Sequence, residues 1–298
     1  MTEELKPQIR LYAILAREAP LAVVFRRGPS KRVQLLLWRT DSHQFHEGQW
    51  LKGRIYERRC DLSPSGNRLI YFAANYKTPY FSWTAVSRPP FLTALALWPK
   101  GDGWGGGGLF ARENTILLNH RAEEMRLAEE FSLPRKIQIR PFGERPGWGE
   151  DSPIVDARLS RDGWLRIQEG KAIEHSIGAS VWIEFSPPQV WAKPHPRLGA
   201  RYELQMHIQG LHQRDGPLYI IEHSMSDQGN GSTVSLGRTD WADWSHSGDL
   251  LFAKEGQLFR LGVSRNGALN ELDNAQVLID LKDRAFKEVA PPSKAKQW

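Results

Sequence analysis

The chain has 298 residues, of which 40% are hydrophobic and 25% charged, a composition typical of a soluble globular protein with a sizeable core. A single cysteine, Cys60, excludes an intrachain disulfide framework and favours a reducing compartment. The net charge is +6, and the excess lies in residues 1–60, where twelve Lys and Arg face six Asp and Glu. Without a recognisable signal peptide or a long apolar run, we expect a cytoplasmic protein that does not engage membranes.

The first fifty residues contain four short strand patterns separated by turn-forming sequences. The separators EAP, GPSK and TDS divide apolar runs at 11–17, 21–28, 32–39 and 43–50. This pattern predicts one four-stranded unit that begins near residue 8.

The second turn of this unit, FRRGPSKR at 25–32, concentrates four cations around Gly28-Pro29. A turn between two strands should direct Arg26, Arg27, Lys31 and Arg32 outwards. These side chains could be ordinary solvated turn charges. They could also form a patch for phosphate, nucleic acid or an acidic partner, to which Arg58 or Arg59 could add one cation.

The stretch CDLSPSGNRLIYFAANY at 60–76 predicts a hairpin, with two strands around a Ser-Pro-Ser-Gly turn. Its frame is Asp61, Ser63 and Gly66, and the same frame recurs at Asp243, Ser245 and Gly248. A shifted form is present at Asp156, Ser160 and Gly163.

The three serines of this frame are separated by 97 and 85 residues, each close to two units of about forty residues, the length of a propeller blade. We therefore predict a single β-propeller domain over 1–298 with about six four-stranded blades. The blades should begin near residues 8, 54, 91, 151, 197 and 239. HRAEEMRLAEEFSL at 120–133 spaces its apolar residues helically and predicts a short helical insertion in the third blade.

The most unusual segment is WPKGDGWGGGGLF at 98–110. Four consecutive glycines let backbone come close to a ligand, Lys100 could bind an oxyanion, and Trp98 or Trp104 could stack on a ring. Alternatively, the glycines form a hairpin tip or are needed where blades crowd the axis. A Walker-type loop is excluded because no Gly-Lys-Ser/Thr follows.

No pattern for catalysis, a metal or a cofactor stands out. His43 and His46 have only His-x-x-His spacing, with no supporting ligand motif, and no Gly-x-Ser-x-Gly elbow is present. The repeated Asp61, Asp156 and Asp243 favour a structural role in turns. We expect Cys60, in a predicted strand, to be a buried inert thiol.

The SPSG and SHSG hairpins resemble the WD40-like repeat of TolB-type β-propellers, and longer stretches such as VVFRRGPSKRVQLLLW resemble a group of uncharacterised bacterial proteins. The resemblance implies a propeller and carries no activity. No unit has the complete Trp-Asp repeat with its Gly-His partner.

These observations favour a non-enzymatic binding or scaffold module that holds a protein or peptide partner on a propeller rim, with Trp98, Lys100, Trp104, Arg26, Arg27 and Lys31 as candidate contacts. One alternative is a hydrolase acting on a phosphorylated or glycan substrate in an axial funnel. Another is nucleic-acid or phosphate binding through the N-terminal cations. The even charge over 61–298 argues against a broad basic stripe.

Overall fold

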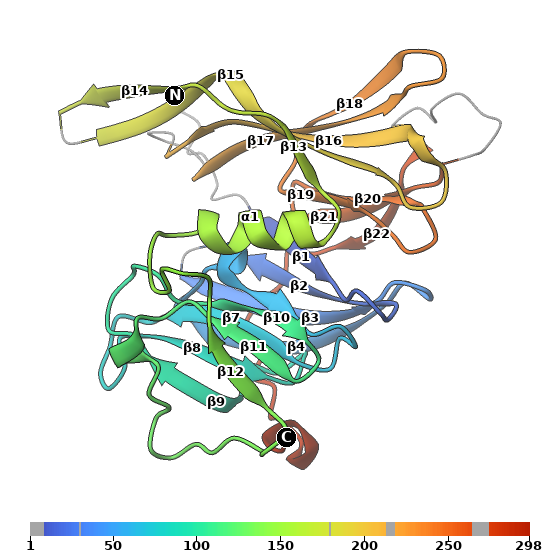
Figure 1. Cartoon of the computed structure of the whole chain (residues 1–298). Coiled ribbons are helices and arrows are strands. Elements are labelled where there is room, and N and C mark those ends of the chain that lie inside the picture. Colours follow the sequence, from blue (N-terminus) through green and yellow to red (C-terminus); the bar gives the residue numbers. More distant parts are fainter. Residues whose placement is uncertain (1–8, 30, 179, 213–217, 264–273) are drawn as a thin grey trace, which may run out of the picture. The chain divides into compact units, whose positions relative to one another are not determined.

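The computed structural model describes residues 9–29, 31–178, 180–212, 218–263 and 274–298. Within these ranges the chain is mostly β-structure in largely antiparallel sheets, as predicted, with one α-helix (Figure 1). It divides into two compact units. Unit 1 comprises the residues up to 158 together with 283–298, and unit 2 comprises residues 159–282.

Unit 1 begins with the predicted four-stranded sheet. Its strands pair consecutively and antiparallel: β1 (Arg10–Leu15), β2 (Leu21–Arg27), β3 (Arg32–Arg39) and β4 (Gln44–Lys52). β2 is buried along both faces apart from its ends, which explains its nearly continuous apolar sequence.

The second sheet of unit 1 surrounds a fully buried strand, β7. Its strands are β5 (Arg54–Ile55), β6 (Asp61–Leu62), β7 (Leu69–Ala74), β8 (Ser82–Ser87) and β9 (Ala94–Pro99). A short 3₁₀ turn, η1 (Glu57–Arg59), separates β5 from β6. The predicted hairpin at 60–76 is confirmed, because β6 and β7 pair antiparallel around the Ser-Pro-Ser-Gly turn.

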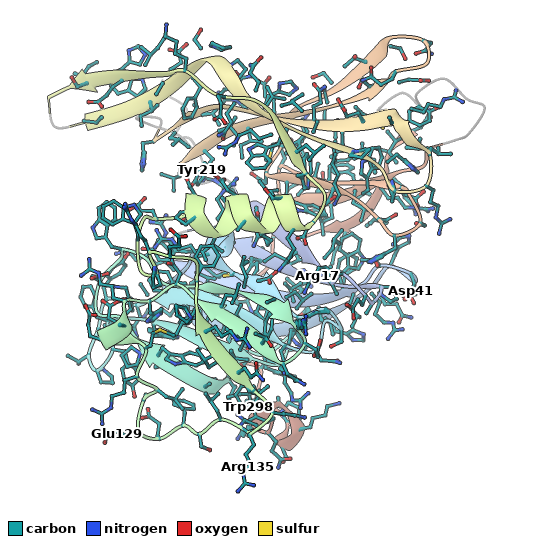
Figure 2. The ribbon with its side chains drawn as sticks, viewed as in Figure 1. Arg17, Asp41, Glu129, Arg135, Tyr219 and Trp298 are labelled. Atoms are coloured by element: carbon teal, nitrogen blue, oxygen red, sulfur yellow. The ribbon has the colours of Figure 1, made fainter. Side chains whose placement is uncertain are left out.

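The third sheet contains β10 (Gly108–Arg112), β11 (Thr115–Leu118) and β12 (Gln138–Pro141), and β12 runs parallel to β11. Residues 283–298 return to unit 1 (Figure 1), where Gln49 Nε2 donates to the Val289 carbonyl at 3.2 Å. Trp298, labelled in Figure 2, donates from its indole to the Ser132 carbonyl at 3.2 Å. The C-terminal segment is thus part of the unit 1 structure.

Unit 2 has two antiparallel sheets. The larger comprises β13 (Leu165–Gln168), β14 (Ala172–Ile177), β15 (Ser180–His195), β16 (Gly199–Leu211), β17 (Tyr219–Asp227) and β18 (Ser232–Arg238). The smaller is a consecutive meander of β19 (Trp241–Trp244), β20 (Leu250–Lys254), β21 (Gln257–Leu261) and β22 (Gln276–Asp280). Trp191, Tyr202 and Trp244 lie in the common core of unit 2.

The turn predicted to repeat has the same Ser-to-Gly backbone bond in two places, although Ser63 pairs with Arg68, five residues on, and Ser245 pairs with Asp249, four residues on. Gly66 N donates to the Ser63 carbonyl at 2.8 Å, and Gly248 N donates to the Ser245 carbonyl at 2.9 Å. In both turns the serine hydroxyl also accepts an amide, from Arg68 at 3.2 Å and from Asp249 at 2.9 Å.

The prediction of a third hairpin, at residues 156–163, was wrong. These residues form most of the helix α1 (Ser152–Arg161) and the turn that follows it. Pro153 suits the first helical turn, and Ile154, Val155 and Arg158 form its buried face. Gly163, at φ +90°, follows the helix where a left-handed residue commonly ends one.

The helix predicted at 120–133 was also wrong. Only a 3₁₀ turn, η2 (Ala122–Glu124), lies there, and Ala128 N donates to the Leu97 carbonyl of β9 at 2.9 Å. Its apolar residues divide between two clusters: Ala128 and Phe131 pack in one, Met125 and Leu127 in the other. Because its apolar residues pack in turn into two clusters, the segment has the spacing of a helix although it forms none.

Three predicted unit boundaries differ from the sheets. β9 completes the second sheet, so no new sheet begins near 91. α1 occupies the start predicted near 151, and β16, near 197, lies inside the larger sheet of unit 2. The starts near 8, 54 and 239 coincide with the beginnings of sheets.

Candidate partner-binding surface

The glycine-rich segment 105–108 is closely packed against its surroundings. A Cβ on Gly106 would lie 2.4 Å from the Phe72 ring, and one on Gly107 would lie 2.2 Å from the Arg59 carbonyl oxygen. Both glycines also have φ near +80°. Close packing against Phe72 and Arg59 therefore accounts for Gly106 and Gly107.

Arg59, almost fully buried, holds this segment in place. Its Nε lies 2.5 Å from Asp151 Oδ1, and its Nη1 donates to the carbonyls of Gly103 at 2.6 Å and Gly105 at 2.7 Å. The guanidinium also lies 4.6 Å from the Tyr56 ring centroid. Because its bonds reach the glycine-rich loop and Asp151, both distant from Arg59 in the sequence, Arg59 is a positioning residue whose role the local sequence does not reveal.

Lys100 forms a second buried contact. Its Nζ lies 2.9 Å from Asp102 Oδ1 and 2.8 Å from Glu124 Oε1, and its side chain is fully buried. Burial acts to raise the pKa of Asp102, but the hydrogen bonds from Lys100 and from the Trp104 amide lower it below its usual value. Lys100 is thus committed to two carboxylates, which contradicts its predicted role as an oxyanion contact.

His120 completes a hydrogen-bonded chain beneath the glycine segment. Nδ1 lies 3.1 Å from the Glu124 carbonyl and must donate to it, so Nε2 accepts from the Thr84 hydroxyl at 2.7 Å. Thr84 Oγ1 in turn accepts from Gly107 N at 2.8 Å. Burial is the main reason why the pKa of His120 falls to about 4, which keeps the ring neutral.

Lys100, Asp102, His120 and Glu124 therefore converge close to Trp104, the combination that a hydrolase in this region would need. Their polar atoms are bonded to one another and to backbone, and Lys100 and His120 are both buried. This arrangement supports the loop structure and offers the hydrolase alternative no exposed acid–base pair.

Two tryptophans project from this support into solvent. Trp104 is 60% exposed and Trp148 is 69% exposed. Each stands in a Gly-Trp-Gly triplet, at 103–105 and at 147–149. The triplets lie side by side, because Gly105 N donates to the Gly149 carbonyl at 2.7 Å.

A second aromatic pair lies nearby. Tyr76 and Phe81 are 45% and 43% exposed, and their rings make an edge contact with centroids 5.2 Å apart. The Tyr76 hydroxyl is 2.7 Å from that of Tyr56, and a Cβ on Gly103 would lie 4.0 Å from the Tyr56 hydroxyl. Burial, followed by this hydrogen bond, raises the pKa of Tyr56 to about 12. We call Tyr76, Phe81, Trp104 and Trp148 the aromatic surface.

An open groove of about 490 Å³ is lined by Tyr80, the residue before Phe81, and by Glu124, the carboxylate that pairs with Lys100. We call Lys100, Asp102 and Glu124 the Lys100 cluster. Four glutamates line it together with Tyr80, Pro99 and Leu127: Glu123, Glu124, Glu129 and Glu130. Glu129 is labelled in Figure 2. Arg126 also lines the groove and lies 3.2 Å from Glu129, so the four carboxylates outnumber the single cation and the groove is acidic on balance.

The other predicted site residues are distributed unevenly. Trp98 is buried in the core of unit 1 and cannot stack on a ligand, which contradicts its predicted role. Arg26 points inwards, donating to the Gly28 carbonyl with its guanidinium 5.4 Å from the Trp50 ring centroid, so the prediction of an outward side chain was wrong.

Four other residues singled out in the sequence are placed as follows. Arg27 lies 3.5 Å from Glu57, and Lys31 is exposed as expected. Cys60 is buried, and its burial raises the pKa of the thiol, as expected for an inert side chain. Asp61 supports backbone, and its carboxylate accepts from Phe110 N of β10 at 2.8 Å.

Trp148, Tyr76 and Phe81 were not predicted from the sequence. The repeated Gly-Trp-Gly triplet was a signal that could have joined Trp148 to Trp104. Within the described ranges, no three His, Cys, Asp or Glu side chains come together as ligands for a metal ion. No helix that the structure describes has both the length and the apolar character needed to cross a bilayer.

Comparisons with known proteins identify no relative that assigns a family. No family model and no curated protein matches the chain. A hydrazine synthase from Kuenenia stuttgartiensis is 10% identical over 92% of this chain and 83% of its own, with a TM-score of 0.29. An acylaminoacyl peptidase in complex with Z-Gly-Gly-Phe-chloromethyl ketone is 10% identical over 89% of this chain and 40% of its own, with a TM-score of 0.23. Similarity this low carries no argument about fold or function.

Proposed function

We propose that this protein is a non-enzymatic binding module that holds a protein or peptide partner on the aromatic surface of unit 1. One observation carries the proposal: two largely exposed tryptophans stand on adjacent Gly-Trp-Gly segments that are held from beneath by Arg59. Tryptophan and tyrosine on a rigid support are the residues that most often dominate binding at protein interfaces.

The buried contacts beneath the aromatic surface indicate that its exposed side chains serve binding. Isolated exposed apolar residues are ordinary in folded proteins. Here buried charges fix the loop that carries Trp104, so little side-chain and loop entropy has to be lost when a partner binds.

We also propose that the sheets are blades of a β-propeller. Consecutive antiparallel meanders such as β1–β4 and β19–β22 have the topology of blades, and the two equivalent Ser-x-Ser-Gly turns fit a repeat. An experimental structure of the chain tests this, since a propeller requires the sheets to be arranged radially about one axis.

The binding proposal is tested with a displayed library of random peptides selected on the full chain. Selected peptides should bind the Trp104→Ala/Trp148→Ala variant at least about thirtyfold more weakly, the loss typical of interface residues that dominate binding. Fluorescence anisotropy measures the dissociation constants.

The matched control is Leu165→Ala/Ile167→Ala, which removes two side chains of unit 2 that are 65% and 56% exposed. It should bind like the unmodified chain. Equal binding by the tryptophan variant, or a library from which no sequence is enriched, would show that the aromatic surface does not hold a peptide.

A further inference from the structure

One end of the first sheet carries a concentration of positive charge. We call the basic sheet end the five cations Arg27, Lys31, Arg32, Lys52 and Arg54. The strand register places Arg32 opposite Lys52, and Gly53 N donates to the Lys31 carbonyl at 2.9 Å. These contacts bring the end of β4 and the start of β5 beside the turn between β2 and β3. Lys31, Arg32 and Lys52 are exposed, so their charge is available to a partner.

The basic sheet end continues directly into the aromatic surface. The Arg54 guanidinium lies 4.4 Å from the Tyr56 ring centroid, and the Tyr56 hydroxyl bonds that of Tyr76. Glu57, next to Tyr56 in the chain, is 3.5 Å from Arg27 and offsets one of the cations. A ligand bound on Tyr76 that extends towards Arg54 therefore reaches the exposed cations of the basic sheet end.

Around Trp104 and Phe81 the aromatic surface instead borders carboxylates. Asp102 adjoins Trp104, and the groove is lined by Glu123, Glu129 and Glu130 against one cation, Arg126, which pairs with Glu129. A nucleic acid strand carries a negative charge at every nucleotide and would be repelled there. A peptide can place its acidic residues on one side and its apolar residues on the other, as this surface requires.

We infer that the partner is an extended peptide with an acidic segment, whose apolar side chains pack on Trp104 and Trp148 while its carboxylates lie over the basic sheet end. The inference rests on the proposed function, to which it adds the chemistry of the partner. Arginine and lysine at the rim of such a contact chiefly select a partner of complementary charge.

The test uses two labelled synthetic peptides of about ten residues, which span up to ~33 Å when extended. Both carry Pro, Leu and Phe in one half, and the other half is rich in Glu in the first peptide and in Gln in the second. A single-stranded oligo(dT) of similar length is the third probe. The full chain is compared with Lys31→Glu/Lys52→Glu and with the matched control Lys136→Glu/Lys171→Glu, which changes two exposed lysines elsewhere.

The acidic peptide should bind at least about tenfold more tightly than its Gln counterpart, and added salt should reduce this preference. Lys31→Glu/Lys52→Glu should remove the preference, while Lys136→Glu/Lys171→Glu should retain it. Equal binding of the two peptides, or tighter binding of oligo(dT), would overturn the inference. If both peptides bind equally and Trp104→Ala/Trp148→Ala weakens them equally, only the acidic partner is excluded. If the tryptophan variant has no effect, the proposed function fails as well.

Discussion

Two regions of the molecule expose apolar side chains, and they are supported very differently. In the aromatic surface of unit 1, the loop that carries Trp104 rests on buried Arg59 and Lys100. In the β14–β15 hairpin of unit 2, Ile173, Ile177 and Val181 are 41–55% exposed, and the ion contact across the hairpin, His175 with Glu184, is itself exposed. Exposure is common to both regions, whereas a buried polar support distinguishes the surface that we assign to binding.

The largest expected difference in unfolding free energy between the two regions comes from their ion pairs, one buried and one exposed. Arg59→Met should lower the free energy of unfolding by about 3–5 kcal/mol, because it leaves the buried Asp151 carboxylate without its guanidinium. Glu184→Gln, which alters the exposed contact with His175 at 3.1 Å, should change it by less than ~0.5 kcal/mol.

Urea denaturation measures both changes. The double variant Arg59→Met/Asp151→Asn should recover part of the loss, since the uncompensated charge is removed. Similar small losses for Arg59→Met and Glu184→Gln would mean that the two regions do not differ in support.

Two glycine substitutions separate the steric cost of an added Cβ from the cost of a positive φ in the free energy of unfolding. Gly106→Ala should cost about 3 kcal/mol, because its Cβ would meet the Phe72 ring at 2.4 Å and its φ is +79°. Gly101→Ala has a similar φ of +82° but nothing within 4 Å, and should cost only about 1 kcal/mol. Equal unfolding free energies for the two variants would contradict close packing at Gly106.

His120 makes the stability of the support dependent on pH. Its pKa is about 4 in the folded chain, below the ordinary 6.5, so between these values the unfolded state binds more protons. The stabilisation is complete above pH 6.5 and is lost as the pH falls towards 4, by about 2 kcal/mol at pH 5. Unfolding measured from pH 7 to pH 5 should show this slope, and His120→Gln should flatten it. An equal slope in His120→Gln would assign the pH dependence to other groups.

The parts of this architecture that depend on local sequence were predictable. The turns at Ser63 and Ser245 follow from their own residues, and so do the four strands of the first sheet. The burial of Arg26 was not predictable, because β2 is covered on both faces and alternation gives no exposed side.

The support of the site depends on contacts between distant residues. Arg59 meets Asp151 across 92 positions, and Thr84 meets His120 across 36. Neither pair has a local pattern from which one partner indicates the other. Trp104 was predicted as a contact because four consecutive glycines follow it. Trp148 could be assigned to the same surface only once the structure placed its Gly-Trp-Gly triplet beside that of Trp104.

The return of residues 283–298 to unit 1 has a consequence for the order of events during synthesis. Residues 159–282 are inserted between two parts of unit 1, so the whole of unit 2 emerges from the ribosome before those last contacts of unit 1 can form. Unit 2 is thus made as a continuous segment that can collapse on its own, while unit 1 must wait for Val289 and Trp298. A nascent chain arrested before residue 283 would therefore expose the part of unit 1 that this segment covers.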